Sequence, residues 1–357
     1  MKKITMKDKM IAFFRNEQID RIPFVHVDNL VGKNEEIWSE IGRENMGLTR
    51  WSRIHRFQSI NCKTVSEKLE KNGLKGIRNT IITPIGNLFE DKYFDPAYMS
   101  EAYSKHFIVD ESDYKIFNYY LKDLLVLPDH DAFLKDQSEV GDDGLAMAVI
   151  YRTPYQKLWI ECVSIEDLSW HMLDNPEVVQ ECVKSLVDIQ KKIFHITYDA
   201  VDKLPIHLVN IPDNITAPLI GESNFRKYCV PYYNELSEML ANKDTSIVVH
   251  MDGSLQSIWA AIRDSKFDAL DSFTPAPDND TGVRQALDQW PDKKLMCNFP
   301  SSVHLESAEK IFDQAVQILE ESRDTNRLWL QISENMPTGV WRKSFPQIIK
   351  AINEFSL

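Results

Sequence analysis

Residues that can bind a metal or transfer a proton stand at the ends of four short apolar runs in the second half of the chain. The runs end at His250, Asp271, Cys297 and Glu334. Imidazole, thiolate and carboxylate groups are typical ligands of zinc, which takes about four ligands and keeps one position open in a catalytic site. If the runs are neighbouring parallel strands, their ends share one rim, and the pattern predicts a catalytic zinc ion there.

The predicted metal ligands are His250, Cys297, Glu334 and Asp252. The predicted catalytic residues are Glu334, Asp271 and Asp213. Asp271 and Asp252 can exchange roles, one as a ligand and the other as the carboxylate that orients His250. Two alternatives stay open. A lone cysteine on an apolar strand is commonly a small core residue, and Asp252 also suits the cap of a following helix.

Polar and aromatic residues follow other predicted strands and suit a small pocket with a few polar anchors. The predicted substrate-binding residues are His26, Asp28, Asn29, Tyr151, Tyr155, Trp159, Asn210 and Asn214. Ordinary capping of loops is the alternative role for each of them.

Alternating strands and helices must position these side chains. From about residue 145, compact apolar runs alternate with helical patterns, which is typical of a parallel α/β fold. The predicted strands cover 22–27, 57–63, 145–151, 205–211, 245–251, 266–273, 293–299 and 328–334. Eight strands fit a closed (β/α)₈ TIM barrel, whose active site lies at the C-terminal ends of the strands. A doubly wound open sheet is the alternative.

Two further elements are expected. Residues 5–17 read as an amphipathic N-terminal helix, and the turn chemistry of Thr83-Pro84-Ile85-Gly86 predicts a β-hairpin inserted into the first half of the barrel. No linker or repeat divides the sequence, so we predict a single barrel domain over residues 1–357.

Composition excludes several classes of protein. The 357 residues carry a net charge of −13, which argues against a nucleic-acid partner because phosphates favour clustered lysine and arginine. There is neither a glycine-rich nucleotide loop nor an apolar run of about 18 residues, so neither a nucleotide cradle nor a membrane span is expected. Five cysteines without a CxxC pair, and no signal peptide, predict a cytoplasmic protein.

The order and spacing of several short motifs resemble the uroporphyrinogen decarboxylase superfamily, over nearly the whole chain. The motifs are Asp20-Arg21-Ile22-Pro23, Thr83-Pro84-Ile85-Gly86, Asp174-Asn175-Pro176-Glu177, Phe225-Arg226-Lys227-Tyr228, Val230-Pro231-Tyr232, His250-Met251-Asp252-Gly253 and Asn298. The resemblance implies a (β/α)₈ barrel with its site at the C-terminal mouth. It covers two branches, the decarboxylases and the cobalamin-dependent methyltransferases.

Two departures distinguish the branches. The decarboxylases carry an arginine-rich segment after the first strand for the porphyrin carboxylates, and this chain has no arginine there, between residues 25 and 40. The methyltransferases typically bind zinc through His-x-Cys and a later Cys. Here Asp252 replaces the first cysteine, and Ser333-Glu334-Asn335-Met336 contains none. A zinc ion with fewer sulfur ligands is a harder Lewis acid, better matched to an oxygen.

The sequence therefore resembles the first methyltransferase of anaerobic O-demethylase systems. We expect transfer of a methyl group from a methoxylated aromatic, or another small methyl donor, to the cobalamin of a separate corrinoid protein. The chain lacks an Asp-x-His-x-x-Gly cobalamin signature, so the corrinoid is expected on another polypeptide. The alternatives are a metal-free carboxy-lyase of the decarboxylase type and a non-catalytic barrel that binds a corrinoid protein or an aromatic compound.

Overall fold

The computed structural model describes residues 4–96 and 100–355. The chain forms two compact units, which are described separately. Unit 1 comprises Met1–Ile54, His130–Ile150 and Ala200–Leu357, and unit 2 comprises His55–Asp129 and Tyr151–Asp199. The single domain over residues 1–357 stays a prediction.

Unit 1 contains a closed barrel of eight parallel strands in the order β1-β14-β13-β12-β11-β10-β9-β2, which confirms the predicted TIM-barrel fold. The strands are β1 (Phe24–Val27), β2 (Gly47–Arg53), β9 (Gly144–Val149), β10 (Leu208–Ile211), β11 (Ser246–His250), β12 (Ala269–Phe273), β13 (Lys294–Asn298) and β14 (Leu328–Ile332). Seven were predicted from their apolar runs. The eighth was wrong, because residues 57–63 lie outside the barrel and β2, with its mixed polar sequence, takes that place.

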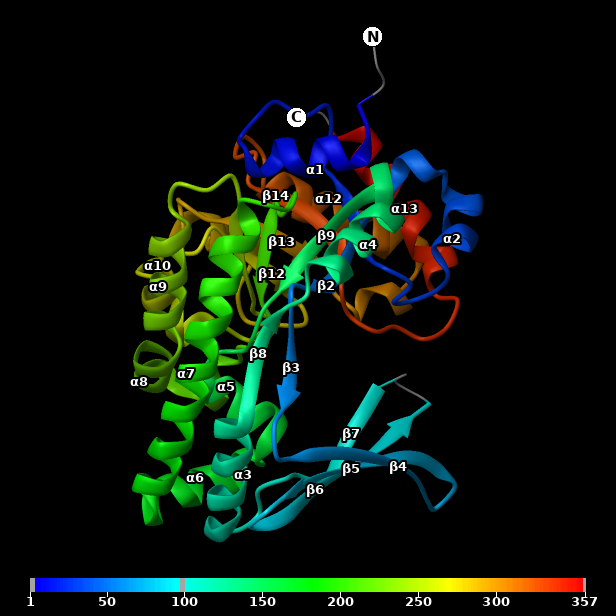
Figure 1. The fold of residues 1–357 in the computed structure, drawn as a ribbon. Coiled ribbons are helices and arrows are strands. Elements are labelled where there is room, and N and C mark those ends of the chain that lie inside the picture. Colours follow the sequence, from blue (N-terminus) through cyan, green and yellow to red (C-terminus); the bar gives the residue numbers. More distant parts are fainter. Residues whose placement is uncertain (1–3, 97–99, 356–357) are drawn as a thin grey trace. The chain divides into compact units, whose positions relative to one another are not determined.

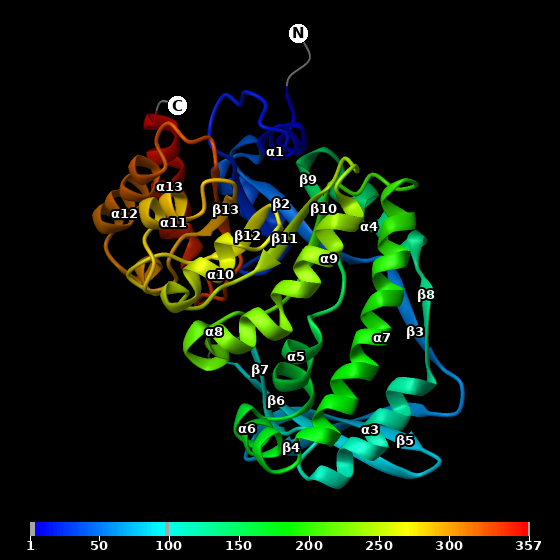
Figure 2. The ribbon, with the colours of Figure 1, turned by 90° about the vertical axis from the view of Figure 1, so that its left-hand side faces the viewer.

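Helices cover the outside of the barrel (Figure 2). They are α2 (Asn34–Ile41), α4 (His130–Val140), α8 (Ala217–Tyr228), α9 (Val230–Leu240), α10 (Trp259–Arg263), α11 (Val283–Gln289), α12 (Ala308–Glu321) and α13 (Trp341–Glu354). Helix α12 illustrates why they form. Its buried residues Ile311, Ala315 and Ile318 recur at helical spacing, so one apolar stripe faces inward and the charged stripe faces solvent.

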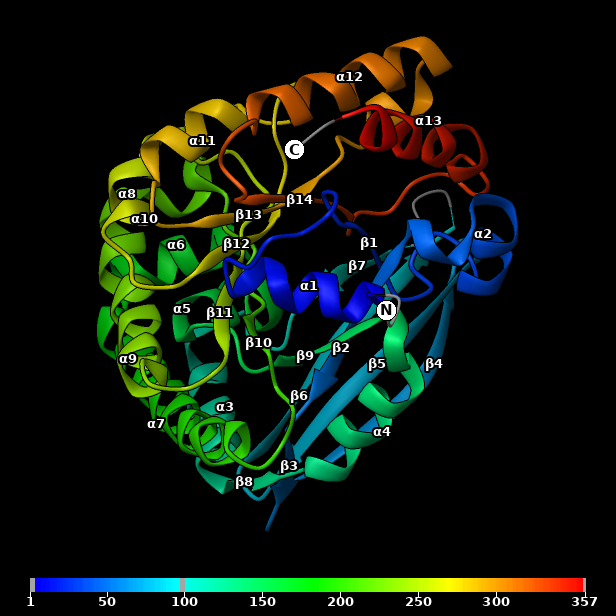
Figure 3. The same cartoon turned by 90° about the horizontal axis from the view of Figure 1, so that it is seen from above.

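Helix α1 (Met6–Phe14) lies across the N-terminal end of the barrel. Figure 3 is viewed from this end and shows the helix in front of the strands. Its side chains Met10 and Phe13 are completely buried, and Phe13 stacks on Trp329 of β14 at 5.5 Å. A capping box between Thr5 and Asp8 starts the helix. The predicted N-terminal helix is thus confirmed, and it closes one end of the barrel with apolar side chains.

Unit 2 contains an antiparallel sheet of β4 (Lys63–Lys71), β5 (Leu74–Thr83), β6 (Gly86–Asp95) and β7 (Ser100–Lys105) (Figure 1). Helix α3 (Glu111–Asp123) packs on β5 and β6. The predicted hairpin is confirmed: Thr83 pairs with Gly86, and the Thr83 hydroxyl donates to the Gly86 carbonyl over 2.7 Å.

The other elements of unit 2 are β3 (His55–Ser59), which pairs with β8 (Leu124–Pro128), α5 (Pro154–Lys157), a π-helix (Leu158–Cys162), α6 (Ile165–Asp174) and most of α7 (Pro176–Val201). In the described part of the chain, no helix combines the length and apolar character needed to cross a bilayer.

Candidate active site

Five neighbouring strands carry a polar side chain directly above the apolar core of the barrel. The core includes Leu208, Val248, Ala269, Met296 and Trp329, one from each strand from β10 to β14. Side chains alternate along a strand, so the residue two positions later faces the same interior. Those residues, which we call the polar layer, are Asn210, His250, Asp271, Asn298 and Gln331. All five are nearly or completely buried.

The opposite arc of the barrel, formed by β1, β2 and β9, is less polar. By the same alternation, Val27 and Val149 follow the core residues Val25 and Met147. From β2, the indole of Trp51 lies 5.8 Å from the ring of His250 in an edge-to-face arrangement, and it is 43% exposed. The C-terminal end of the barrel therefore presents a polar arc facing Trp51, Val27 and Val149, with Arg53 at the exposed end of β2.

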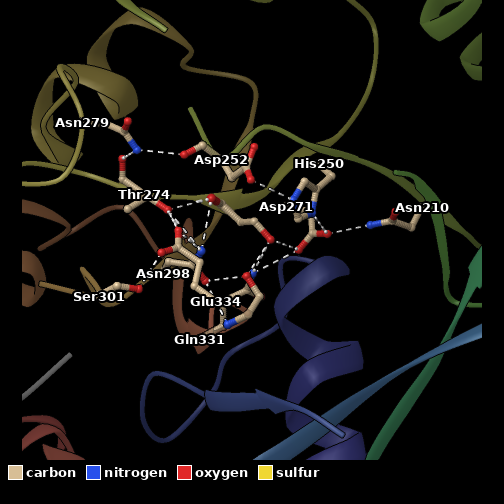
Figure 4. A network of polar contacts seen from close by, with 12 residues as sticks. Asn210, His250, Asp252, Asp271, Thr274, Asn279, Asn298, Ser301, Gln331 and Glu334 are labelled. Atoms are coloured by element: carbon tan, nitrogen blue, oxygen red, sulfur yellow. Dashed lines mark hydrogen bonds and ion pairs between the residues drawn. The ribbon is translucent and has the colours of Figure 1, made fainter. Parts of the chain in front are cut away.

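His250 lies between two carboxylates (Figure 4). Its Nδ1 lies 3.3 Å from Oδ2 of Asp271, and its Nε2 lies 3.5 Å from Oδ2 of Asp252. Burial lowers the pKa of His250, but the hydrogen bonds and charges of the two aspartates outweigh burial and raise the pKa to about 10. At neutral pH this side chain is an imidazolium that donates from both nitrogens.

The carboxylate of Asp271 is fully satisfied by its neighbours. Oδ2 accepts from Asn210 Nδ2 at 2.7 Å and from His250, while Oδ1 accepts from Gln331 Nε2 at 3.0 Å. Burial by itself would raise the pKa of Asp271. These donors and the charge of His250 outweigh burial and lower the pKa below its usual value, so the carboxylate stays ionised. A buried anion of this kind fixes the position and the charge of His250.

A β-bulge in β12 brings two consecutive residues into this network. Ser272 has a left-handed backbone with φ of 62°, and the pairing with β13 shifts register between Leu270 and Phe273. Its hydroxyl lies 2.7 Å from that of Ser333 and also contacts Asp271. Such bulges re-aim side chains near active sites, and here the bulge connects the His250 site to the next cluster.

Glu334 is the centre of that second cluster. Its Oε1 accepts from Thr274 Oγ1 at 2.5 Å and from Asn298 Nδ2 at 3.1 Å, and its Oε2 accepts from Ser301 Oγ at 2.6 Å. Asn298 also accepts from Ser333 at 2.7 Å, so the polar contacts run continuously from Asn210 to Ser301 (Figure 4). The glutamate thus stabilises the loops after β12, β13 and β14.

The structure does not bring the predicted zinc ligands together. Asn298 faces the barrel interior, so its neighbour Cys297 faces outward, and the charge that acts on its thiol is that of Glu321 on α12. Burial raises the pKa of Cys297 well above its usual range, which disfavours the thiolate that binds metals. Cys297 is a small core residue, as in the alternative interpretation.

The remaining donors do not fit a catalytic zinc site, which takes three protein ligands. Among the described residues, no group of three or more His, Cys, Asp or Glu side chains is arranged to hold a metal ion. His250 and Asp252 supply two donors, Asp271 lies on the opposite ring nitrogen, and both oxygens of Glu334 are engaged in the loop cluster.

Three predicted substrate-binding residues, on the first strand and its loop, make structural contacts, and their substrate role stays a prediction. His26 faces α13, where its ring lies 6.1 Å from Phe345, and its Nε2 accepts from the backbone of Val31. Asp28 accepts from Arg50 and Asn34 at 2.5 Å each. Asn29 and Asn34 cap each other's backbone at 3.1 Å. These contacts hold the loop before α2.

The other predicted residues divide between the two units. Asn210 belongs to the polar layer of unit 1. Asp213 is buried behind it and accepts from Tyr233 Oη of α9 at 2.7 Å, and Asn214 follows in the same loop. Tyr151, Tyr155 and Trp159 lie in unit 2, at the start of its second segment, on α5 and on the π-helix; their substrate role stays a prediction.

Several residues of the site were missed from the sequence, among them Trp51, Ser272 and Gln331. Trp51 was missed because β2 was not recognised: its sequence, GLTRWSR, does not alternate between apolar and polar residues. Gln331 was missed because strand ends were read rather than inward positions. Its place two residues after the core residue Trp329 was the signal. No residue pattern in the sequence predicts the β-bulge that brings Ser272 into the network.

The fold and the buried acid–base site define the class of protein. It is a parallel (β/α)₈ barrel with polar residues at the C-terminal ends of its strands. A protein-family model described as uroporphyrinogen decarboxylase (URO-D) matches residues 162–355, more than half of the chain. The chain therefore belongs to the uroporphyrinogen decarboxylase family. A comparison with curated proteins gave no significant match.

A solved structure shares the fold. A methyltransferase from Methanosarcina mazei superposes with a TM-score of 0.58 at 12% identity, covering 99% of this chain and 99% of that one. An endo-beta-mannanase/endo-beta-glucanase from Prevotella bryantii gives a TM-score of 0.36 at 10% identity, over 67% of this chain and 45% of that one.

Proposed function

We propose that this chain transfers a methyl group from a methoxylated aromatic compound to the cob(I)alamin of a separate corrinoid protein, as a cytoplasmic methyltransferase of its family. The observation that carries the proposal is the imidazolium of His250, held between Asp252 and Asp271 at the C-terminal end of the barrel. The full-length fold similarity to a methyltransferase supports the reaction class.

His250 is assigned as the general acid. The bond between the methyl carbon and the ether oxygen breaks, both electrons of that bond stay on the oxygen, and the oxygen takes the proton from His250 Nε2. The methyl group leaves as the electrophile, and the reduced corrinoid supplies the electron pair that accepts it. His250 is then neutral, and Asp252, whose side chain is 32% exposed, lies beside Nε2 to pass a proton back from solvent.

The acidity of His250 suits a phenolate leaving group. Its pKa of about 10 is close to that of a phenol, about 10 for tyrosine. The proton can therefore pass from His250 to the phenolate oxygen at little cost in free energy as the bond to the methyl group breaks. Trp51 offers an aromatic surface next to His250, and the adjoining arc is aliphatic, so a planar aromatic ring fits the chemistry of this side.

The same site is poorly suited to a porphyrin with many carboxylates. The polar layer contains no lysine or arginine. On β2, Arg50 is paired with Asp28 and Glu139, and Arg53, two residues after Trp51, adds a single cation at the exposed end of the strand. Charge-assisted bonds to several propionates need cationic partners. This favours methyl transfer over decarboxylation within the family.

The proposal is tested by incubating the purified chain with methoxylated benzenes and free cob(I)alamin and recording the absorbance change on methylation. His250→Gln should lower the rate by a factor of about 10² or more, the usual contribution of a general acid. The control is His26→Gln, which changes the buried histidine that faces α13.

Three results would contradict the proposal or a part of it. Release of carbon dioxide from uroporphyrinogen at a comparable rate would make the chain a decarboxylase. Binding of methoxylated aromatics without any methyl transfer, to free cob(I)alamin or to a corrinoid protein, would favour a non-catalytic binding protein. Cobalamin bound tightly to the purified chain would overturn the proposal of a separate corrinoid carrier.

A further inference from the structure

Strand β4 forms an edge of the antiparallel sheet in unit 2 (Figure 1). It pairs with β5 along its whole length, from Lys63 opposite Ile82 to Lys71 opposite Leu74, and in the described part of the chain no strand lies on its other side. Every residue of β4 is exposed except Leu69, which is half-buried. Alternate backbone groups of an edge strand point away from its one neighbour, so β4 can pair with a further strand.

Four charged residues in the last part of β4 form no salt bridge within the described chain. They are Glu67, Lys68, Glu70 and Lys71. Across the hairpin, Lys68 lies opposite Ile77 and Lys71 lies opposite Leu74. The two lysines therefore have no carboxylate directly opposite them on β5.

The order of these four charges makes the strand complementary to itself. When two copies of β4 are paired antiparallel with Leu69 opposite Leu69, Glu67 lies opposite Lys71 and Lys68 lies opposite Glu70. Two-fold symmetry repeats both pairs, so every charge between residues 67 and 71 lies opposite a charge of the other sign. Opposite charges directly across two strands stabilise the pairing, and like charges destabilise it.

Two neighbouring registers bring like charges together. A pairing centred on Glu67 would use the whole strand, but it places Glu67 opposite itself and Lys63 opposite Lys71. A pairing centred on Lys68 places that lysine opposite itself. Lysines on edge strands commonly prevent pairing with other chains. On β4 they disfavour these two registers and favour the register centred on Leu69.

We propose that the free edge of β4 pairs with β4 of a second copy of this chain, with the two-fold axis at Leu69, so that the two sheets become continuous. The self-complementary charges identify the second copy as the partner, because a two-fold interface brings the same strand from both chains together. The turn at Asn72 and Gly73 directly follows the paired segment and keeps it short. The contact is therefore small, and the dimer exchanges with the monomer.

The first test is a cross-link at the symmetry axis in the full chain. All five native cysteines are buried, so Leu69→Cys adds a single accessible thiol. Mild oxidation should join two copies through this thiol, because directly opposite residues have Cα atoms about 4.5–5.5 Å apart, within the range of a disulfide. Val65→Cys, on the same face of the same strand, is the matched control and should stay monomeric under the same conditions.

The second test changes the charges. Sedimentation velocity of the wild type over a concentration series should show a monomer–dimer equilibrium. Lys68→Glu should raise the dissociation constant by about tenfold, because two attractive pairs become repulsive, and adding Glu70→Lys to the same chain should restore the wild-type value. Lys63→Glu makes the same charge change outside the paired segment and should leave the dissociation constant unchanged.

Three results would overturn the proposal. A wild type that stays monomeric at every concentration, together with a Leu69→Cys chain that does not cross-link, would show that the edge of β4 is only solvated. Equal cross-linking of Val65→Cys and Leu69→Cys would show random collision or another register. A dimer that is insensitive to Lys68→Glu would place the interface on another surface.

Discussion

His250 Nδ1 lies 3.3 Å from Oδ2 of Asp271, and both side chains are almost completely buried. The pair is stable as two charges because Asp271 keeps further donors and His250 has a second carboxylate on its other nitrogen. A buried ion pair with one partner removed leaves an uncompensated charge. The protonation state of His250 therefore depends directly on its two aspartates.

The first prediction concerns the titration of His250. We expect nuclear magnetic resonance of labelled histidine to give a midpoint of about 10 in the wild type, because two carboxylates stabilise the imidazolium. Asp252→Asn should lower the midpoint by removing one of those charges. His26 serves as an internal reference whose pKa is shifted in the opposite direction, because burial lowers it to about 4. A wild-type midpoint near the ordinary value of about 6.5 would contradict the assignment of His250 as an acid.

The second prediction concerns stability. The folded pKa of His250 lies above its unfolded value, so its contribution to the free energy of unfolding is complete below pH of about 6.5. It is lost as the pH rises from there through about 10. Urea unfolding of the wild type and of His250→Gln should show the difference in free energy falling over this range, by on the order of 1.4 kcal/mol per unit of pKa shift. A constant difference would show that His250 is neutral in the folded protein.

The third prediction separates the two roles considered for Cys297. Because its thiol is buried on the helix side of β13, Cys297→Ser should lower the free energy of unfolding by about 1–3 kcal/mol, since burial of a hydroxyl among apolar side chains costs desolvation. Metal content, measured by elemental analysis before and after the substitution, should not change. Cys297→Ala is the control that removes the sulfur without adding a polar group. Stoichiometric zinc that is lost in Cys297→Ser would restore the cysteine as a ligand.

The fourth prediction concerns Trp51 and follows from the proposed function. Its indole lies beside His250 and is 43% exposed, so Trp51→Ala should leave the fold intact. The substitution should raise KM for methoxylated benzenes by about tenfold, since stacking on an aromatic ring is worth about 0.5–1.5 kcal/mol in addition to the area it buries. Trp51→Phe should recover most of the affinity. An unchanged KM in Trp51→Ala would place the aromatic ring elsewhere.

Much of the fold followed from local patterns. Compact apolar runs identified seven barrel strands, because a parallel strand buried on both faces must be apolar along its length. The hairpin at Thr83 and Gly86 followed from its turn residues, and the N-terminal helix from its apolar spacing. Strand β2 was not predicted, because exposed and charged residues interrupt any apolar run in its sequence.

For the candidate site, the sequence by itself determined that His250, Asp271 and Asn210 stand near the C-terminal ends of neighbouring barrel strands. Only the tertiary structure decided which side chains face inward, because the direction alternates with every residue and a shift of one position reverses it. That alternation places Cys297 and His26 against the helices and brings Gln331 and Trp51 into the barrel. It also turns Cys297 away from the other candidate ligands, while His250 lies between two aspartates.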